Sequence, residues 1–411
     1  MTNNDKVLRQ IVLGAGASSG YPLGSDLLRI IAGISKFFNP TIPAEFITKL
    51  KSIKFENHEK ELITDAEDFL IKVKNFAENL KKSCATSIDF YTTRIADKKM
   101  QIVAKSLIGA VLKQYKTDLK NTWYGDLLPL FFPEDVVFKK PEEKLEMIIG
   151  LSKKIRIITF NYDLSLEKFL YEFLKNNVFV GGEEAQLESA KRVIFQTINH
   201  VYGSIDDPFN CDFDLIEEGG VGDLKKLDIN YAVDNYPDKP EDFQFINLEK
   251  VEILINLIFG ALKDAFANQQ VYNKNIKLME NERRTEIENS DYKLIDCAYL
   301  YVLGFGFDPI NIERIGMKPE VWGGKVYPYS EYGYGCYVTN FDDNKKIERL
   351  LINSLTKRSS SSYLVPIISK RKIADALKND FSLMEINKNY EFISINNSSQ
   401  ASPFFALKKY Q

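Results

Sequence analysis

The chain has 411 residues, of which 45% are hydrophobic and 27% are charged, an ordinary composition for a globular protein. Its formal net charge of -3 argues against nucleic-acid binding through phosphate neutralisation, which needs a basic face. The polar first residues resemble no signal peptide, and no apolar run is long enough to span a membrane. We therefore expect a cytoplasmic protein that binds neither membranes nor, directly, nucleic acids. Scattered cysteines, with no CxxC pair, exclude a zinc ribbon and fit a reducing cytosol: Cys84, Cys211, Cys297 and Cys336.

The first predicted unit is a short buried strand, Arg9 to Leu13, that ends at a glycine turn. A helix is predicted from Ser25 to Phe38, where apolar residues recur at helical spacing before Asn39-Pro40. From about 39 to 150 the pattern predicts mostly amphipathic helices with charged outer faces, apart from an aromatic, proline-containing loop at 127–138.

Strands, turns and helices then alternate along the rest of the chain. Helices are predicted at 161–176, 247–270 and 344–355. Strands are predicted at 156–160, 193–202, 298–303 and 336–341. This alternation is typical of the α/β class, here a Rossmann-like, doubly wound and mainly parallel sheet with a large helical insertion.

We expect one nucleotide-binding domain over residues 1–355. Its core strands fall in 1–38 and 151–355, and its helical insertion covers about 39–150. A serine run at 358–362 predicts a linker. The segment 356–411 is then a C-terminal extension for assembly or partner binding.

The glycine turn has the pattern GxGxxxG, formed by Gly14, Gly16 and Gly20. Dinucleotide-binding dehydrogenases instead use GxGxxG, with an acid about 20 residues later that holds the adenosine ribose. No acid stands at 34–36, so the usual dehydrogenase arrangement is missing. The turn either cradles a pyrophosphate with its backbone N–H groups or is simply a tight strand-to-helix connection.

Polar residues follow the later strands, at the edge where open α/β sheets bind ligands. Asn161 suits a ribose hydroxyl or a water molecule, and Asp163 is either a site residue or a helix cap. Of the two histidines, His58 lies in a polar stretch and is simplest as a surface residue. His200 ends a strand, and is either a general base or a buried, hydrogen-bonded core residue.

Five short motifs, in this order, resemble the sirtuin-like family, and in particular its bacterial branch of antiviral-defence effectors. They are GAGASSGYP (14–22), TFNYD (159–163), HVYGSID (200–206), LGFGFD (303–308) and VTNF (338–341). The resemblance implies an NAD site in which Asn161, Asp163 and His200 are catalytic. It implies that NAD is also contacted by Gly14, Ala15, Gly16, Ser18, Pro22, Tyr202, Gly203, Gly304, Gly306, Asp308 and Asn340.

The sequence departs from the family pattern in two ways. Deacylating sirtuins carry a zinc module with two CxxC pairs, which this chain cannot form. The family's catalytic histidine stands directly before a glycine, where this chain has Tyr202. His200 lies two residues earlier, on the same face of the expected strand.

The resemblance therefore implies an NAD glycohydrolase that cleaves NAD, as substrate, to nicotinamide and ADP-ribose without a metal. Such an activity needs gating, so we expect a homo-oligomer and a separate activator, such as a HerA-type hexameric ATPase or a short Argonaute. Two alternatives stay open: a non-catalytic module that senses NAD or ADP-ribose, and a zinc-free NAD-dependent deacylase.

Overall fold

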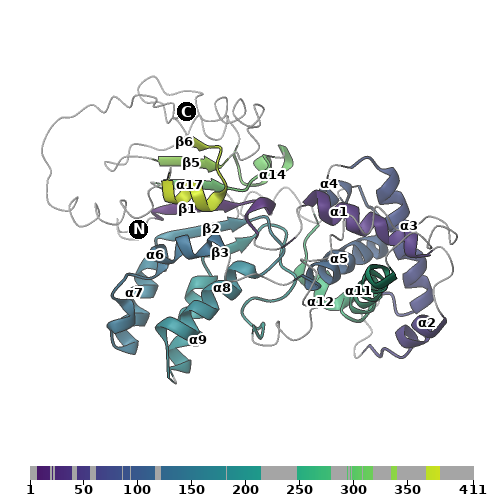
Figure 1. Ribbon diagram of the computed structural model, residues 1–411, viewed down its shortest axis with the longest axis horizontal. Coiled ribbons are helices and arrows are strands. Elements are labelled where there is room, and N and C mark those ends of the chain that lie inside the picture. The colour runs from purple at the N-terminus through teal and green to yellow at the C-terminus, as the bar shows by residue number, and fades with distance from the viewer. Residues whose placement is uncertain are drawn as a thin grey trace, which may run out of the picture.

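Figure 1 shows the computed structural model, in which a parallel sheet lies beside a block of helices. The structure describes residues 7–18, 21, 24–38, 44–55, 62–85, 87–92, 94–115, 122–181, 183–213, 248–278, 294, 297, 299–307, 309–317, 335–339 and 367–379.

The sheet has six strands, all parallel, in the order β3-β2-β1-β4-β5-β6. This is the strand order of the doubly wound nucleotide-binding fold, in which the chain reverses direction across the sheet between β1 and β4. The structure thus confirms the predicted α/β, Rossmann-like class. The strands are β1 (Arg9–Leu13), β2 (Ile155–Thr159), β3 (Ile198–His200), β4 (Tyr299–Leu303), β5 (Gly335–Thr339) and β6 (Ile367–Ser369).

The central strands are buried on both faces, which explains why most of their residues are apolar. Every residue of β1 is buried, and Val12 and Ile158 are fully enclosed. Helix α7 packs against β2 and α9, while α17 crosses the sheet in the view of Figure 1. The helices on the sheet side are α6 (Leu128–Phe131), α7 (Pro141–Ser152), α8 (Ser165–Phe173), α9 (Glu184–Phe195), α14 (Pro309–Arg314) and α17 (Ile373–Asn379).

The remaining helices form what we call the helical lobe, and the strand arrowheads in Figure 1 point toward it. Its central helix is α5, which packs against α1, α3, α11 and α12. The helix cap of α5 is Asp97, whose carboxylate accepts from the Lys99 N–H at 2.8 Å. The lobe consists of α1 (Gly24–Gly33), α2 (Ala44–Lys51), α3 (Ala66–Lys82), α4 (Ile88–Thr92), α5 (Lys98–Lys113), α11 (Leu248–Ala267) and α12 (Gln269–Asn275).

Short helical turns join these elements. One of them, η2, follows β1 directly, and another, η5, leads into α6. They are η2 (Ala15–Ala17), η3 (Ile34–Phe38), η5 (Trp123–Leu127), η6 (Val136–Phe138) and the π-helical turn η7 (Leu174–Val178).

Two predictions of element bounds are wrong. The strand predicted at 193–202 is the end of α9 followed by the shorter β3. The loop predicted at 127–138 contains α6 and η6. The sheet itself continues past the boundary predicted at residue 355, because β6 pairs with β5 through Tyr337 and Ile367.

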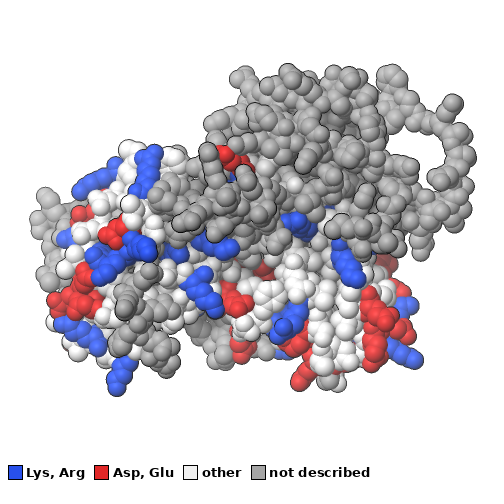
Figure 2. Space-filling model, turned by 180° about the vertical axis from the view of Figure 1, so that it is seen from behind, with Lys and Arg blue, Asp and Glu red and all other residues white. Residues whose placement is uncertain are grey.

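The face shown in Figure 2 has lysine, arginine and acidic side chains interspersed over its described residues, with no uniformly basic area among them. Within the described part of the chain, no helix is both long and apolar enough to cross a membrane.

Candidate functional site

The candidate site lies at the carboxyl edge of the sheet, where the turns after β1 and β4 meet. The Gly14 N–H donates to the Leu303 carbonyl at 3.0 Å, and the Gly16 N–H donates to the Gly304 carbonyl at 3.1 Å. This is the topological switch point of the sheet, the usual ligand position in open α/β folds.

The glycines here are required first by the packing of one turn on the other. A Cβ atom at Gly14 would lie 2.4 Å from the Gly304 carbonyl oxygen. Gly304 itself has φ +60, and a Cβ there would lie 2.5 Å from the Ala17 nitrogen. The tight-connection interpretation of the first turn therefore accounts for Gly14 and Gly304 without a ligand.

Most of the backbone N–H groups expected to cradle a pyrophosphate are bonded within the protein. Besides Gly14 and Gly16, the Ala17 N–H donates to the Gly14 carbonyl at 2.9 Å and the Ser18 N–H to the Ala15 carbonyl at 3.3 Å. Among the described residues of these two turns, Gly16 and Gly306 are exposed, and a Cβ at Gly306 would meet no atom within 4 Å. A ligand can thus lie close to the chain at these two glycines.

Asn161 has an unsatisfied acceptor at this edge. It follows β2, its backbone N–H donates to the Thr159 hydroxyl at 3.1 Å, and the residue is only 8% exposed. Its amide oxygen Oδ1 is buried and accepts no hydrogen bond from any described residue. Leaving such an oxygen unpaired costs about 1–3 kcal/mol, so a donor on a ligand or a water is expected there. A ribose hydroxyl meets that requirement, whereas an ionised phosphate does not.

Asp163 joins the two neighbouring turns rather than facing solvent. One carboxylate oxygen accepts from the Ser18 hydroxyl at 2.5 Å. The other accepts from the hydroxyl of Ser165 and, at 3.1 Å, from its N–H at the start of α8, whose N-cap residue is Leu164 rather than Asp163. Burial raises the pKa of Asp163 above its ordinary value of 3.8, although these hydrogen bonds oppose that effect.

The acid that holds a ribose in dehydrogenases would not fall at residues 34–36 in this fold. Residues 14–154 separate β1 from β2 in the chain, so the strand beside β1 begins only at Ile155. An acid after that strand does exist, Asp163, but it is 5% exposed and both its oxygens are engaged by serines. The position that holds a ribose in dehydrogenases is thus filled by a structural carboxylate.

The insertion contributes to the same hydrogen-bond network. The Tyr124 hydroxyl lies 2.6 Å from the Ser165 hydroxyl, and the Trp123 indole N–H donates to the Ala17 carbonyl at 2.9 Å. Residues of η5 therefore hold both the turn after β1 and the start of α8.

His200 lies at the end of β3 with both ring nitrogens engaged. Nε2 lies 2.6 Å from a carboxylate oxygen of Glu167, and Nδ1 lies 2.8 Å from the backbone carbonyl oxygen of Asn161. The side chains of His200 and Glu167 are 8% and 2% exposed. Burial alone lowers the pKa of His200, but the Glu167 carboxylate and the two hydrogen bonds outweigh it, so the pKa is raised above 6.5.

Sequence reasoning missed Glu167. It lies on α8 on the same face as Leu170 and, one turn on, Leu174, both fully buried. An acid at an apolar position of a helix, shortly after a candidate site residue, is the signal that could have identified it.

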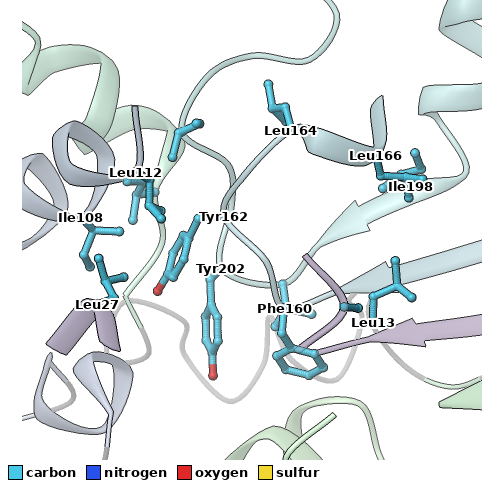
Figure 3. Close-up of a cluster of buried hydrophobic side chains, with 14 of the residues drawn as sticks. Leu13, Leu27, Ile108, Leu112, Phe160, Tyr162, Leu164, Leu166, Ile198 and Tyr202 are labelled. Carbon is cyan, nitrogen blue, oxygen red and sulfur yellow. The ribbon is translucent and has the colours of Figure 1, made fainter. Parts of the chain in front are cut away.

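Tyr202 and Gly203 belong to the packing between the sheet and the helical lobe. The Tyr202 ring is 1% exposed and stacks on Tyr162 with centroids 5.7 Å apart, and its hydroxyl donates to Asn311. Figure 3 shows both tyrosines between Leu27, Ile108 and Leu112 of the lobe and Leu13 and Phe160 of the sheet. Gly203, at φ +68, bridges to Ile276 after α12. We assign both residues to packing rather than to ligand contact.

The other predicted site residues, Pro22, Asp308 and Asn340, lie outside the described residues, as does His58. Among the residues that are described, no cluster of histidine, cysteine or acidic side chains is arranged to hold a metal ion.

Comparisons of the chain with protein-family models, curated proteins and solved structures found no match.

Proposed function

We propose that this protein is an NAD glycohydrolase, which converts NAD and water to nicotinamide, ADP-ribose and a proton. The observation that carries the proposal is the buried, unpaired Oδ1 of Asn161 at the carboxyl edge. It is supported by the strand order of a nucleotide-binding sheet and by the exposed glycines 16 and 306 beside the switch point.

The chemistry asks little of the protein beyond positioning. Nicotinamide leaves as a neutral molecule from a cationic glycoside, so its departure needs no general acid, and water then adds to an oxocarbenium-like ribose. Asn161 would accept a hydrogen bond from a ribose hydroxyl or from that water. Holding the ribose and the water in reacting geometry is then the main contribution to the rate.

The test is nicotinamide release from NAD by the purified protein, alone and with a HerA-type ATPase or a short Argonaute from the same source as the expected activator. Asn161→Ala removes the amide and is expected to lower turnover by about 100-fold or more. Asn176→Ala is the matched control, because its amide donates to Glu172 on the exposed side of the helix. NAD that stays intact under every condition would refute the proposal.

The second candidate, a module that binds NAD or ADP-ribose without cleaving it, is favoured by one observation. Both nitrogens of His200 are engaged, so the histidine expected to be the base has no lone pair directed at a ligand. This candidate predicts tight binding of NAD with no nicotinamide release with or without the activator.

We further propose that the enzyme is a gated NAD-depleting effector of antiviral defence that self-assembles and is switched on by a HerA-type ATPase or a short Argonaute. Size-exclusion chromatography with and without the proposed activator tests the assembly. A monomer in both cases would contradict it.

A further inference from the structure

We propose that Glu167 and His200 form a positioning pair for Asn161: the carboxylate holds the imidazole, and the Nδ1–H of the imidazole holds the Asn161 backbone carbonyl. The pair rests on the proposed function for its kinetic readout, since Asn161 is the residue that would contact the ribose. His200 then acts through Asn161 and is a positioning residue rather than a base.

The two contacts of the imidazole ring determine where its hydrogens must lie. A backbone carbonyl oxygen only accepts, so the 2.8 Å contact to Asn161 places a hydrogen on Nδ1. The 2.6 Å contact between Nε2 and Glu167 then holds one further proton between a ring nitrogen and a carboxylate. Because the pKa of His200 is raised, we assign that proton to the ring, which makes it an imidazolium with the Glu167 carboxylate as its counter-charge.

The Glu167 and His200 side chains have few other hydrogen-bond partners available to them. Both side chains are nearly inaccessible to water, so a broken contact is not replaced by solvent. The held carbonyl belongs to Asn161 itself, whose backbone N–H is fixed by Thr159 on the other side. The pair therefore limits the backbone at the one residue whose side-chain oxygen is left for a ligand.

A positioning role and a general-base role for His200 predict opposite changes of turnover with pH. If His200 loses a proton, one nitrogen lone pair faces either the Asn161 carbonyl or the Glu167 carboxylate, and one contact is lost. Turnover should therefore fall as pH rises through the pKa of His200. A general base would show the reverse, because it must be deprotonated to act.

The charged groups that act on His200 come from two elements. Glu167 lies on α8, and Asp163 lies in the turn after β2, and both raise the pKa of His200. In Glu167→Gln the main carboxylate is gone and burial lowers the pKa, so the fall in turnover should move to lower pH. Glu172→Gln removes a carboxylate from the outer side of the same helix and is the matched control.

The experiment combines a histidine titration with pH profiles of nicotinamide release. The chain has two histidines, so a His58→Gln variant leaves the ring signal of His200 alone in an NMR titration. We expect a His200 pKa above 6.5. In Glu167→Gln we expect a pKa below 6.5 and a kcat about 10-fold lower, with the alkaline fall displaced and with Glu172→Gln unchanged.

Each outcome decides the proposal. A His200 pKa at or below 6.5 in the otherwise unaltered chain overturns it, and so does turnover that rises with pH through that pKa. Equal kcat values and profiles for Glu167→Gln and the wild type also overturn it. If the wild type leaves NAD intact, the proposed function fails but the pair is not yet tested. The affinity for NAD is then the quantity to compare between the variants, in place of kcat. A weaker affinity in Glu167→Gln then supports the pair, and an equal affinity overturns it.

Discussion

Gly304 is the residue whose replacement the structure predicts to be least tolerated at the candidate site. It combines φ +60 with a Cβ position 2.5 Å from the Ala17 nitrogen, so alanine is strained in conformation and overlaps the turn after β1. We expect Gly304→Ala to lower the free energy of unfolding by about 3 kcal/mol in a urea titration. Gly306→Ala is the control, since nothing lies within 4 Å of its Cβ position. This substitution should change the free energy of unfolding by less than about 0.5 kcal/mol.

The Glu167–His200 pair also predicts a pH dependence of stability. The pKa of His200 is raised in the folded state, so its contribution is complete below the ordinary value of 6.5 and is lost as pH rises through the folded value. Glu167→Gln should therefore be less stable than the wild type by about 3 kcal/mol near pH 6, and by less near pH 9. Urea titrations at the two pH values measure this difference. A difference that grows with pH would contradict the assigned protonation.

At the residue scale, the sequence locates side chains but not what they bond to. Asn161, Asp163 and His200 do lie at the carboxyl edge, because residues that follow parallel strands must meet there. That Asp163 is taken up by serines and His200 by Glu167 depends on contacts between separate turns. The spacing of residues along the sequence does not predict those contacts.

Two helical glycines provide a matched test of packing at the scale of the elements. Gly109 lies in α5, where a Cβ would come within 2.2 Å of the Tyr272 ring of α12. Gly150 lies in α7, where a Cβ would meet nothing within 4 Å.

We expect Gly109→Ala to destabilise the protein by about 1–3 kcal/mol, because α12 must move away from α5. Gly150→Ala should instead stabilise it by about 0.5–1 kcal/mol, because alanine is the better helix former. Thermal unfolding followed by circular dichroism compares the two. Equal shifts in Tm would show that α12 does not pack on α5 in this way.

Strands were predicted best where they are long and buried. β1, β2, β4 and β5 fall within a few residues of their predicted bounds. The alternation at 193–202 misled because it spans the end of a helix: Leu187, Ala190 and Ile194 are buried at helical spacing, and the strand begins only at Ile198. A strand of three residues such as β6 has too few positions to show any periodicity.

At the scale of the whole molecule, the helical lobe draws on separate stretches of the chain. α11 and α12 pack on α5, although more than 130 residues separate them, and the charged-face pattern of α5 gave no sign of this. Residues 102–112 are all buried, and Lys105 donates to the Asn273 carbonyl at 2.9 Å. Sequence periodicity identifies such helices, but their partners depend on tertiary packing.

β6 is an edge strand, and it covers β5 on one side of the sheet. β6 pairs in parallel with β5 through Tyr337, Val338 and Thr339, and α17 follows it and packs against η5 beside the candidate site. A chain ended at residue 366 loses both elements. Its β5 would become an edge strand with unpaired N–H and carbonyl groups, which favours association between chains.

We therefore expect a chain ended at residue 366 to aggregate or to unfold at a Tm several degrees lower than that of a chain ended at residue 379, which keeps β6 and α17. Light scattering and thermal unfolding of the two chains, prepared side by side, measure the difference. If both chains behave alike, the sheet is stable without its sixth strand. That result would support the domain boundary predicted at residue 355. If only the longer chain is folded, residues 367–379 belong to the same folding unit as the sheet, and the binding site for the proposed activator is expected outside them.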